Sequence, residues 1–206
     1  MVLPEFNLVT IETNTMTTGR LEAFSDGVLA IILTIMVLEL KIPVGEDISS
    51  LKPFIPKILN YLLSFIFVGV YWNNHHHLFH AIDKINGATL WSNLALLFWL
   101  SLLPVATGWL DEHIHSKWPA AVYGFVLLMS SISFRLIEIS ALKVEGQSEI
   151  FLKSLESQRK ENITILLYIL GIAIAFFQPE ISIILYILVI LMWFIPDKRI
   201  EKTLKN

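Results

Sequence analysis

The chain has 206 residues, of which 55% are hydrophobic and 16% are charged, and its mean hydropathy is +0.66. Soluble domains carry about 25% charged residues, so this composition excludes an ordinary soluble domain and indicates an integral membrane protein. The net charge of −3 identifies no partner. The chain has no cysteine, which excludes disulfides, thiol chemistry and cysteine-ligated metal sites.

Six apolar segments alternate with polar breaks, and most are close to the length of about 20 residues that a membrane-spanning helix needs. Backbone groups inside a membrane must be hydrogen-bonded within the segment, which predicts helices, and the alternating pattern of a barrel strand is missing from this sequence. We therefore predict an all-α integral membrane protein with six transmembrane helices. The segments cover residues 22–41, 54–79, 88–110, 119–142, 162–178 and 181–196.

An even number of spans places both termini on the same side of the membrane, and Lys and Arg residues indicate which side. With the N-terminus inside, ten of these residues fall in inner regions and four in outer regions. We predict a multi-pass protein of the cell (plasma) membrane. Residues 20–196 form its six-helix domain, and residues 1–19 and 197–206 are cytoplasmic tails, the first without the basic start of a signal peptide. The inner residues are Arg20, Lys84, Lys143, Lys153, Arg159, Lys160, Lys198, Arg199, Lys202 and Lys205, and the outer residues are Lys41, Lys52, Lys57 and Lys117.

The first apolar segment carries a stripe of apolar side chains. Ile31, Ile35 and Leu38 are spaced i, i+4 and i+7, and Thr34 lies beside them. The spacing alone suits packing against other helices or lipid equally well. Asp26 lies five residues before Ile31 and points about 140° away from the stripe. Because an ionisable residue at the edge of a span normally faces the protein interior, we expect Asp26 to find a partner there.

Charged residues crowd the start of this segment. Glu22 and Asp26 are one helical turn apart and would repel each other if both were charged and exposed. At least one of them is therefore expected to have a cationic or hydrogen-bonding partner. Arg20 and the histidines at the end of the second segment are the candidates.

The second segment ends in the sequence YWNNHHHLFH. Its three adjacent histidines point in different directions on a helix, so they cannot all bind one metal. His76 and His80 have the i, i+4 spacing of a pair that can share zinc, but no H-E-x-x-H pattern accompanies them, and we reject zinc catalysis. The expected role of the histidines is polar contact between helices, and Asn93 of the third segment is a candidate partner.

Two polar or helix-breaking features lie deeper in the spans. Pro104 is predicted to kink the third helix. Arg135, which falls inside the fourth span, is predicted to pair with Glu138 or to extend to the membrane surface. The sequence lacks the TVGYG filter of ordinary potassium channels.

Arg20, Phe24, Ser25 and Asp26 match the signature R-x-x-x-F-S-D, and on this match the chain resembles the prokaryotic members of the transmembrane protein 175 family of potassium channels. A single copy of six spans is similar to these members, which assemble as tetramers, whereas animal members carry two copies per chain. The match continues through Ala30, Ile31, Thr34, Leu38, Glu39, Trp72, His75, His76, Leu78, Phe79, Asn93, Leu103, Pro104 and Thr107.

The resemblance implies a potassium-selective leak-type channel, in which the first helices of four subunits surround the pore without a re-entrant filter loop. It implies a hydrophobic constriction at Ile31, further apolar rings at Ile35 and Leu38, and a selectivity layer at Thr34. The alternative for Thr34 is purely structural, with its hydroxyl bonded back to the carbonyl of Ala30 and no effect on ions. The expected partners are three further copies of the chain, the lipid bilayer and permeant potassium ions. No cofactor, metal or nucleic acid is expected.

The resemblance also implies that the F-S-D residues contact a histidine and an asparagine of neighbouring helices. These positions correspond to Asn93 and to either His75 or His76. The charged start of the first helix is then a structural clasp, formed by Arg20, Phe24, Ser25 and Asp26 with these partners, that sets the rotation of the helix.

Two other classes of function remain alternatives. A secondary transporter would favour inverted repeats and helices broken at mid-membrane, and neither is evident in the sequence. A membrane-embedded enzyme would use the histidine cluster with Asp26, but these residues form no catalytic constellation. The channel is the favoured interpretation.

Overall fold

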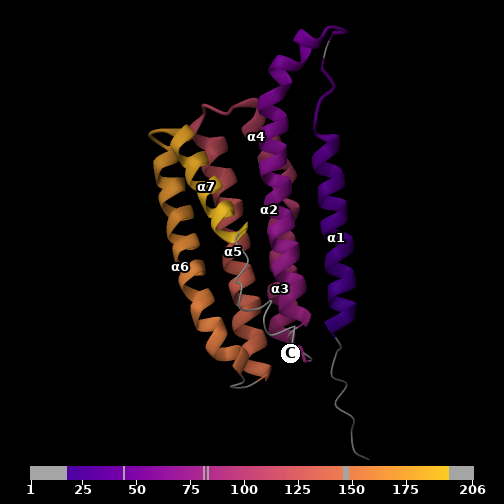
Figure 1. Cartoon of the computed structure of the whole chain (residues 1–206), viewed down its shortest axis with the longest axis vertical. Helices are drawn as coiled ribbons and strands as arrows, with labels where there is room; N and C mark the ends of the chain where they lie inside the picture. Colours follow the sequence, from indigo (N-terminus) through magenta and orange to yellow (C-terminus); the bar gives the residue numbers. More distant parts are fainter. Residues whose placement is uncertain (1–17, 44, 81, 83, 146–148, 195–206) are drawn as a thin grey trace, which may run out of the picture.

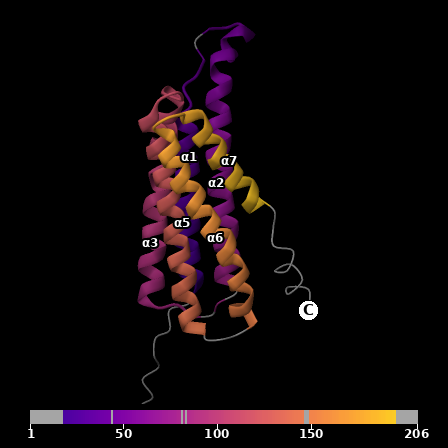
Figure 2. The ribbon, with the colours of Figure 1, turned by 90° about the vertical axis from the view of Figure 1, so that its left-hand side faces the viewer.

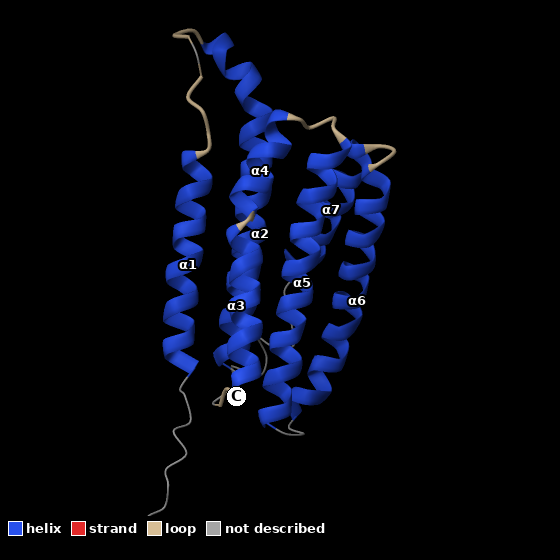
Figure 3. Ribbon diagram, turned by 180° about the vertical axis from the view of Figure 1, so that it is seen from behind, coloured by secondary structure: helices blue, strands red, loops and turns tan. Residues whose placement is uncertain are grey.

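The computed structural model of the chain describes residues 18–43, 45–80, 82, 84–145 and 149–194. This part folds into a bundle of long helices (Figure 1), and it contains no strand (Figure 3). The predicted tails fall on residues outside the described part, except that Thr18 and Gly19 already belong to the first helix. The helices are α1 (Thr18–Leu38), the 3₁₀ helix η1 (Ile48–Phe54), α2 (Ile55–His80), α3 (Gly87–Ser101), α4 (Leu103–Glu112), α5 (Lys117–Glu145), α6 (Glu149–Ala175) and α7 (Pro179–Phe194).

The third apolar segment is broken rather than merely kinked. It forms α3 and α4, which meet at Leu102, two residues before Pro104. Proline has no backbone N–H and its ring crowds the preceding turn, so the helix cannot continue unchanged through this position. The break leaves few open backbone groups, because Leu102 N donates to Trp99 O at 3.2 Å and Ala106 N donates to Leu102 O at 3.0 Å. The sequence predicted a kink at Pro104, and the structure shows an interruption of the helix two residues before it.

The polar stretch between the fourth and fifth segments is also more helical than predicted. We expected a break from Lys143 to Glu161, but α5 continues to Glu145 and α6 already begins at Glu149. The physical reason is that polarity marks where lipid ends, and not where a helix ends. The stretch is rich in Glu, Lys, Leu, Gln and Arg, which favour helix in water as well.

The last two helices, α6 and α7, form a tight hairpin. The turn between α6 and α7 is closed by Gln178 N, which donates to Ile174 O at 2.8 Å, and Pro179 stands at the first position of α7. Proline is well tolerated there, because the first N–H groups of a helix have no partner within it.

The centre of the bundle is α5, which packs against α3, α4, α6 and α7. Figure 2 shows α3, α5 and α6 running alongside one another for much of their length. Tyr186 of α7 is fully buried here, and its hydroxyl donates to Ala120 O at 3.2 Å. Its ring fits between Gly124 and Gly171, where an added Cβ would lie 2.0 Å and 2.4 Å from the nearest Tyr186 atoms. Close packing of this kind through small residues is typical of helices in membranes.

Four helical stretches of the described part are long and apolar enough to cross a membrane. They are Thr18–Leu38, Ile48–His80, Gly87–Glu112 and Lys117–Ala141, and the apolar helix Pro179–Trp193 is shorter. Each of the first four matches one predicted span. The all-helical membrane class is therefore confirmed, whereas the count of six spans stays a prediction.

Candidate functional site

Helix α1 lies at the edge of the bundle (Figure 1) and packs against α2, α3 and α4 with one face only. The buried face repeats every three to four residues, as expected for a helix with one covered side. From Gly27 to Leu38, beyond the charged start of the helix, the opposite face is exposed in the subunit and is apolar apart from Thr34. The buried residues are Leu21, Ser25, Leu29, Ile32 and Met36.

A buried chain of hydrogen bonds joins α1 to α3 and α2. Ser25 Oγ donates to Leu21 O in the preceding turn at 2.9 Å, and it accepts from Asn93 Nδ2 at 2.9 Å. Asn93 Oδ1 in turn accepts from Nε2 of His75 at 2.8 Å. Ser25 and Asn93 are completely buried and His75 is nearly so. An unpaired polar group in this buried environment costs free energy. These hydrogen bonds therefore hold α1 in one rotation about its axis.

The structure selects His75 from the two candidate histidines. His76 points away from Asn93 and stacks on the indole of Trp72, with ring centroids 5.8 Å apart. Adjacent residues on a helix differ by about 100° in direction, so only one of them can face α3. The family resemblance includes both His75 and His76, so the sequence does not distinguish them.

Asp26 has a partner that the sequence analysis missed. Trp72 Nε1 of α2 donates to Asp26 Oδ1 at 2.9 Å, and both side chains are exposed, so the expectation that Asp26 faces the protein interior was wrong for the single subunit. An indole N–H at the edge of a membrane protein typically seeks such an acceptor. Trp72 was among the positions that match the family, but the sequence analysis assigned it no contact.

Two members of the predicted clasp do not join it within the subunit. Arg20 is exposed, and the structure records no ion pair between its guanidinium and any other described residue. Phe24 is 53% exposed and lies outside the apolar core of the described residues. Within the described subunit the clasp therefore consists of Ser25, Asn93 and His75, and a part for Arg20 and Phe24 stays a prediction.

The four positions expected to face a pore all lie on the uncovered side of α1. Ile31, Ile35 and Leu38 are 61%, 43% and 77% exposed, and Thr34 is exposed beside them. The Thr34 hydroxyl donates to Ala30 O at 2.8 Å. Since that bond uses the only hydroxyl proton, the oxygen lone pairs remain available as acceptors on the exposed face.

Charged residues gather at the opposite end of α1. Lys41 forms an exposed ion pair with Glu112 at the end of α4, and this hydrogen bond raises the pKa of Lys41. An exposed pair of this kind contributes little to stability. The pair borders a cavity of about 290 Å³ that Glu39, Lys57 and Asp111 also line.

Polar contacts deeper in the bundle tie α2, α4, α5 and α6 together. Ser64 Oγ lies 2.8 Å from Thr107 Oγ1 and 3.0 Å from Tyr123 Oη. Arg135 forms no ion pair with Glu138 within the described residues, although one of the sequence hypotheses proposed that pair. Its Nε lies 3.6 Å from Oε2 of the buried Glu161 on α6. Residues on α6 were not weighed as partners, because the sequence does not show which helices are neighbours.

These features define a polytopic α-helical membrane protein, whose first helix is anchored on one face and bare on the other. A family model described as endosomal/lysosomal potassium channel TMEM175 matches residues 20–104. A protein named a potassium channel from Chryseobacterium sp. (strain P1-3) is 55% identical over 191 residues, which cover 93% of this chain and all of that protein. The chain belongs to the TMEM175 potassium channel family, whose members are ion channels and not enzymes.

Solved structures agree with this assignment. The crystal structure of a lysosomal potassium-selective channel TMEM175 homolog from Chamaesiphon minutus superimposes with a TM-score of 0.72 at 30% identity, covering 85% of this chain and 95% of that one. The potassium channel MtTMEM175, solved as a threonine-to-alanine variant, shares the fold, with a TM-score of 0.66 at 19% identity and coverage of 94% and 99%.

Proposed function

We propose that this chain forms a potassium-selective leak-type channel, in which the α1 helices of four subunits line the pore. Six spans and cytoplasmic termini complete the proposed architecture in the cell membrane. Potassium is the permeating ion, and no cofactor takes part. Membership of a potassium channel family supports the ion, and the geometry of α1 supports the pore helix.

The observation that carries the proposal is the two-sided character of α1. The buried bonds from Ser25 through Asn93 to His75 fix the rotation of the helix. That rotation leaves Ile31, Thr34, Ile35 and Leu38 without cover from the subunit. A side chain can line a shared pore only if its own subunit does not bury it.

Several subunits are needed to enclose an aqueous path. In the described part of one subunit, α1 stands at the edge of the bundle, so a pore formed by α1 must be completed by other copies. Soluble oligomers and channels commonly use closed cyclic symmetry, and four copies follow from the family.

In the proposed pore, rings of Ile31, Ile35 and Leu38 act as gates. Apolar constrictions of this kind stop ion flow when they dewet, and they conduct when they widen enough to hold water. Ile31, Ile35 and Leu38 are exposed in the subunit, so rings of these side chains can form such constrictions without a re-entrant loop.

Thr34 is proposed to favour potassium over sodium. Its hydroxyl proton is committed to Ala30 O at 2.8 Å, so each subunit offers oxygen lone pairs and no proton towards the pore. Four such oxygens at one level can replace part of the hydration shell of a cation. Potassium holds its water less tightly than sodium, so this replacement favours potassium.

The transporter and the enzyme are not favoured. The break at Leu102 resembles the discontinuous helices of transporters, but its backbone groups are largely paired within the chain. The histidines of α2 are engaged in helix contacts and ring stacking.

Recordings from purified protein in planar bilayers test the proposal. Unitary potassium currents are expected, and Thr34→Ala is expected to lower the potassium preference measured from bi-ionic reversal potentials. Thr34→Ser keeps the hydroxyl and serves as the matched control. Slow, saturating transport without unitary currents would exclude a channel, and an unchanged reversal potential in a conducting Thr34→Ala protein would remove Thr34 from the mechanism.

A further inference from the structure

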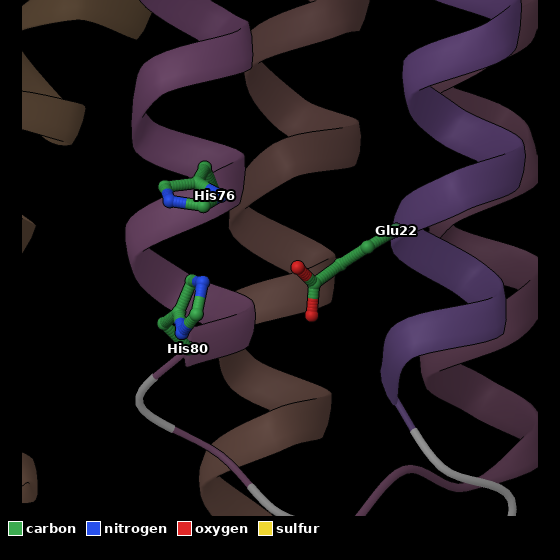
Figure 4. A group of neighbouring side chains, drawn as sticks. All are labelled: Glu22, His76 and His80. Carbon is green, nitrogen blue, oxygen red and sulfur yellow. The ribbon is translucent and has the colours of Figure 1, made fainter.

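Glu22, His76 and His80 form a cluster of possible metal ligands between α1 and α2. Figure 4 shows the Glu22 carboxylate extending from α1 towards the two imidazoles, which lie one above the other on α2. One ligand atom from each side chain can be chosen so that all three lie within 4.8 Å of one another. The two imidazole centroids are 4.4 Å apart. The proposed channel mechanism uses none of these three side chains.

The donor set fits a transition-metal dication. Two histidines and one carboxylate are a frequent ligand set for zinc, with the fourth position open to water. Calcium and magnesium prefer oxygen ligands alone, so a pair of imidazoles disfavours them. Zinc ligands in a tetrahedron are about 3.3 Å apart, so the ligand atoms must move closer by at most about 1.5 Å. Glu22 and His76 are only partly buried and His80 is exposed, so their side chains have room to do so.

The cluster is connected to the contact that holds α1. The indole of Trp72 stacks on His76 with an angle of 16° between the rings, and the same indole donates to Asp26 of α1. Stacking limits the rotation of the His76 ring, as the neighbours of metal-binding histidines commonly do. A metal bound here would add a second link between α1 and α2, one turn of α1 away from Asp26.

We propose that Glu22, His76 and His80 bind a transition-metal dication, with Zn²⁺ as the natural probe, and that the bound ion ties α1 to α2. The effect of the ion on current rests on the proposed pore role of α1, whereas the binding does not. Tying the two helices together limits the movement of α1, so Zn²⁺ is expected to reduce potassium current.

Binding is tested by titrating Zn²⁺ into the purified full-length protein and measuring heat, with Co²⁺ absorption as a report on the ligands. One ion per subunit is expected. Glu22→Gln and His80→Gln should each weaken binding at least about tenfold, as loss of a ligand exceeds the tenfold to hundredfold effects of its neighbours. Both side chains are at least partly exposed, so neither change should prevent folding. His77→Ala removes an exposed histidine next to the cluster and should leave binding unchanged.

Two binding results would overturn the site. Absence of binding to the wild-type protein would do so directly. Unchanged affinity in Glu22→Gln, with loss of affinity in His80→Gln, would mean that α2 binds the metal alone and that no link to α1 exists.

Current recordings test the coupling separately. Zn²⁺ should reduce current in the wild-type and His77→Ala proteins, and not in Glu22→Gln. Binding at the three residues without a change in current would overturn the coupling and leave the site intact. If the protein conducted no potassium at all, the proposed function would fail, while the binding result would still decide the site.

Discussion

Helices α1 and α5 are both apolar and long enough to cross a membrane, but the subunit covers them very differently. In the most apolar part of α1, 28% of the residues are buried, compared with 61% in the corresponding part of α5. Helix α5 has neighbours around most of its circumference, whereas α1 has them on one side. Apolar composition therefore does not show which helix is central and which has a face left over for lipid or another subunit.

The two helices are also held by different forces. At α5, Tyr186 fits against Gly124 and Gly171 with no room for a further carbon atom. At α1, Ser25 is bonded through Asn93 to His75. Lipid tails are as apolar as leucine, so close packing and interhelical hydrogen bonds must supply specificity inside a membrane. Packing fixes the place of α5, and hydrogen bonding fixes the rotation of α1.

The largest effect on stability is expected when a methyl group is added to a glycine of α5. The same change in α1 is the comparison. Gly124→Ala puts a Cβ 2.0 Å from Tyr186 Oη in α5, which overpacks the bundle and should cost about 2–3 kcal/mol of unfolding free energy. Gly27→Ala in α1 meets nothing within 4 Å and should be neutral or stabilising by up to about 1 kcal/mol. Thermal unfolding of both proteins in one detergent measures the difference. Equal stabilities would contradict the contrast drawn between the two helices.

A smaller loss is expected when the buried clasp is broken. Asn93→Leu removes the partner of both Ser25 and His75, and it should destabilise the protein by about 1–2 kcal/mol. Asn73→Leu changes an exposed asparagine of α2 and is the matched control. Denaturation in mixed micelles compares the two. A clasp that held nothing would give the same midpoint for both variants.

The bare face of α1 should respond in current rather than in stability. Ile31→Asn would place a polar side chain in the proposed constriction, keep it wet and raise the resting current severalfold. Ile184 of α7 is 55% exposed, close to the 61% of Ile31, so Ile184→Asn tests an equally bare position on another helix. Single-channel recordings give the open probability of each. If Ile31→Asn left the current unchanged in a correctly assembled protein, the constriction would lie elsewhere.

The smallest effect is expected at Asp26. Its bond with Trp72 is accessible to solvent, so Asp26→Ala should cost only about 1 kcal/mol, less than the loss at Asn93. Asp26→Asn keeps an acceptor oxygen for the indole and should cost less still. Unfolding midpoints measure both, and recordings show whether selectivity changes. An altered ion preference in a stable Asp26→Ala protein would contradict a purely positional role and indicate a part in permeation.

Much of the architecture was predictable from local sequence. Runs of hydrocarbon side chains predicted the four helices of membrane length, because a backbone in lipid has almost no alternative to helix. Pro104 predicted a kink close to the place where the helix is interrupted, since its ring cannot fit inside a regular helix. The motif around Ser25 indicated the family and the asparagine and histidine contacts of α1. The helices and the interruption depend on residues close together in the chain, whereas the contacts of α1 came from the family resemblance.

The choices that only the tertiary structure decided all involve residues far apart in the chain. Whether His75 or His76 contacts Asn93 depends on the rotation of α2 relative to α3. The two histidines are adjacent and of the same residue type, so the sequence cannot distinguish them. Trp72 became the partner of Asp26, and Glu161 that of Arg135, because α1 lies against α2 and α5 against α6. Hydrophobicity is nearly the same on every side of a helix in lipid, so it carries little information about which side meets a neighbour. That information comes from the packing of small residues and from the few polar groups that must be paired.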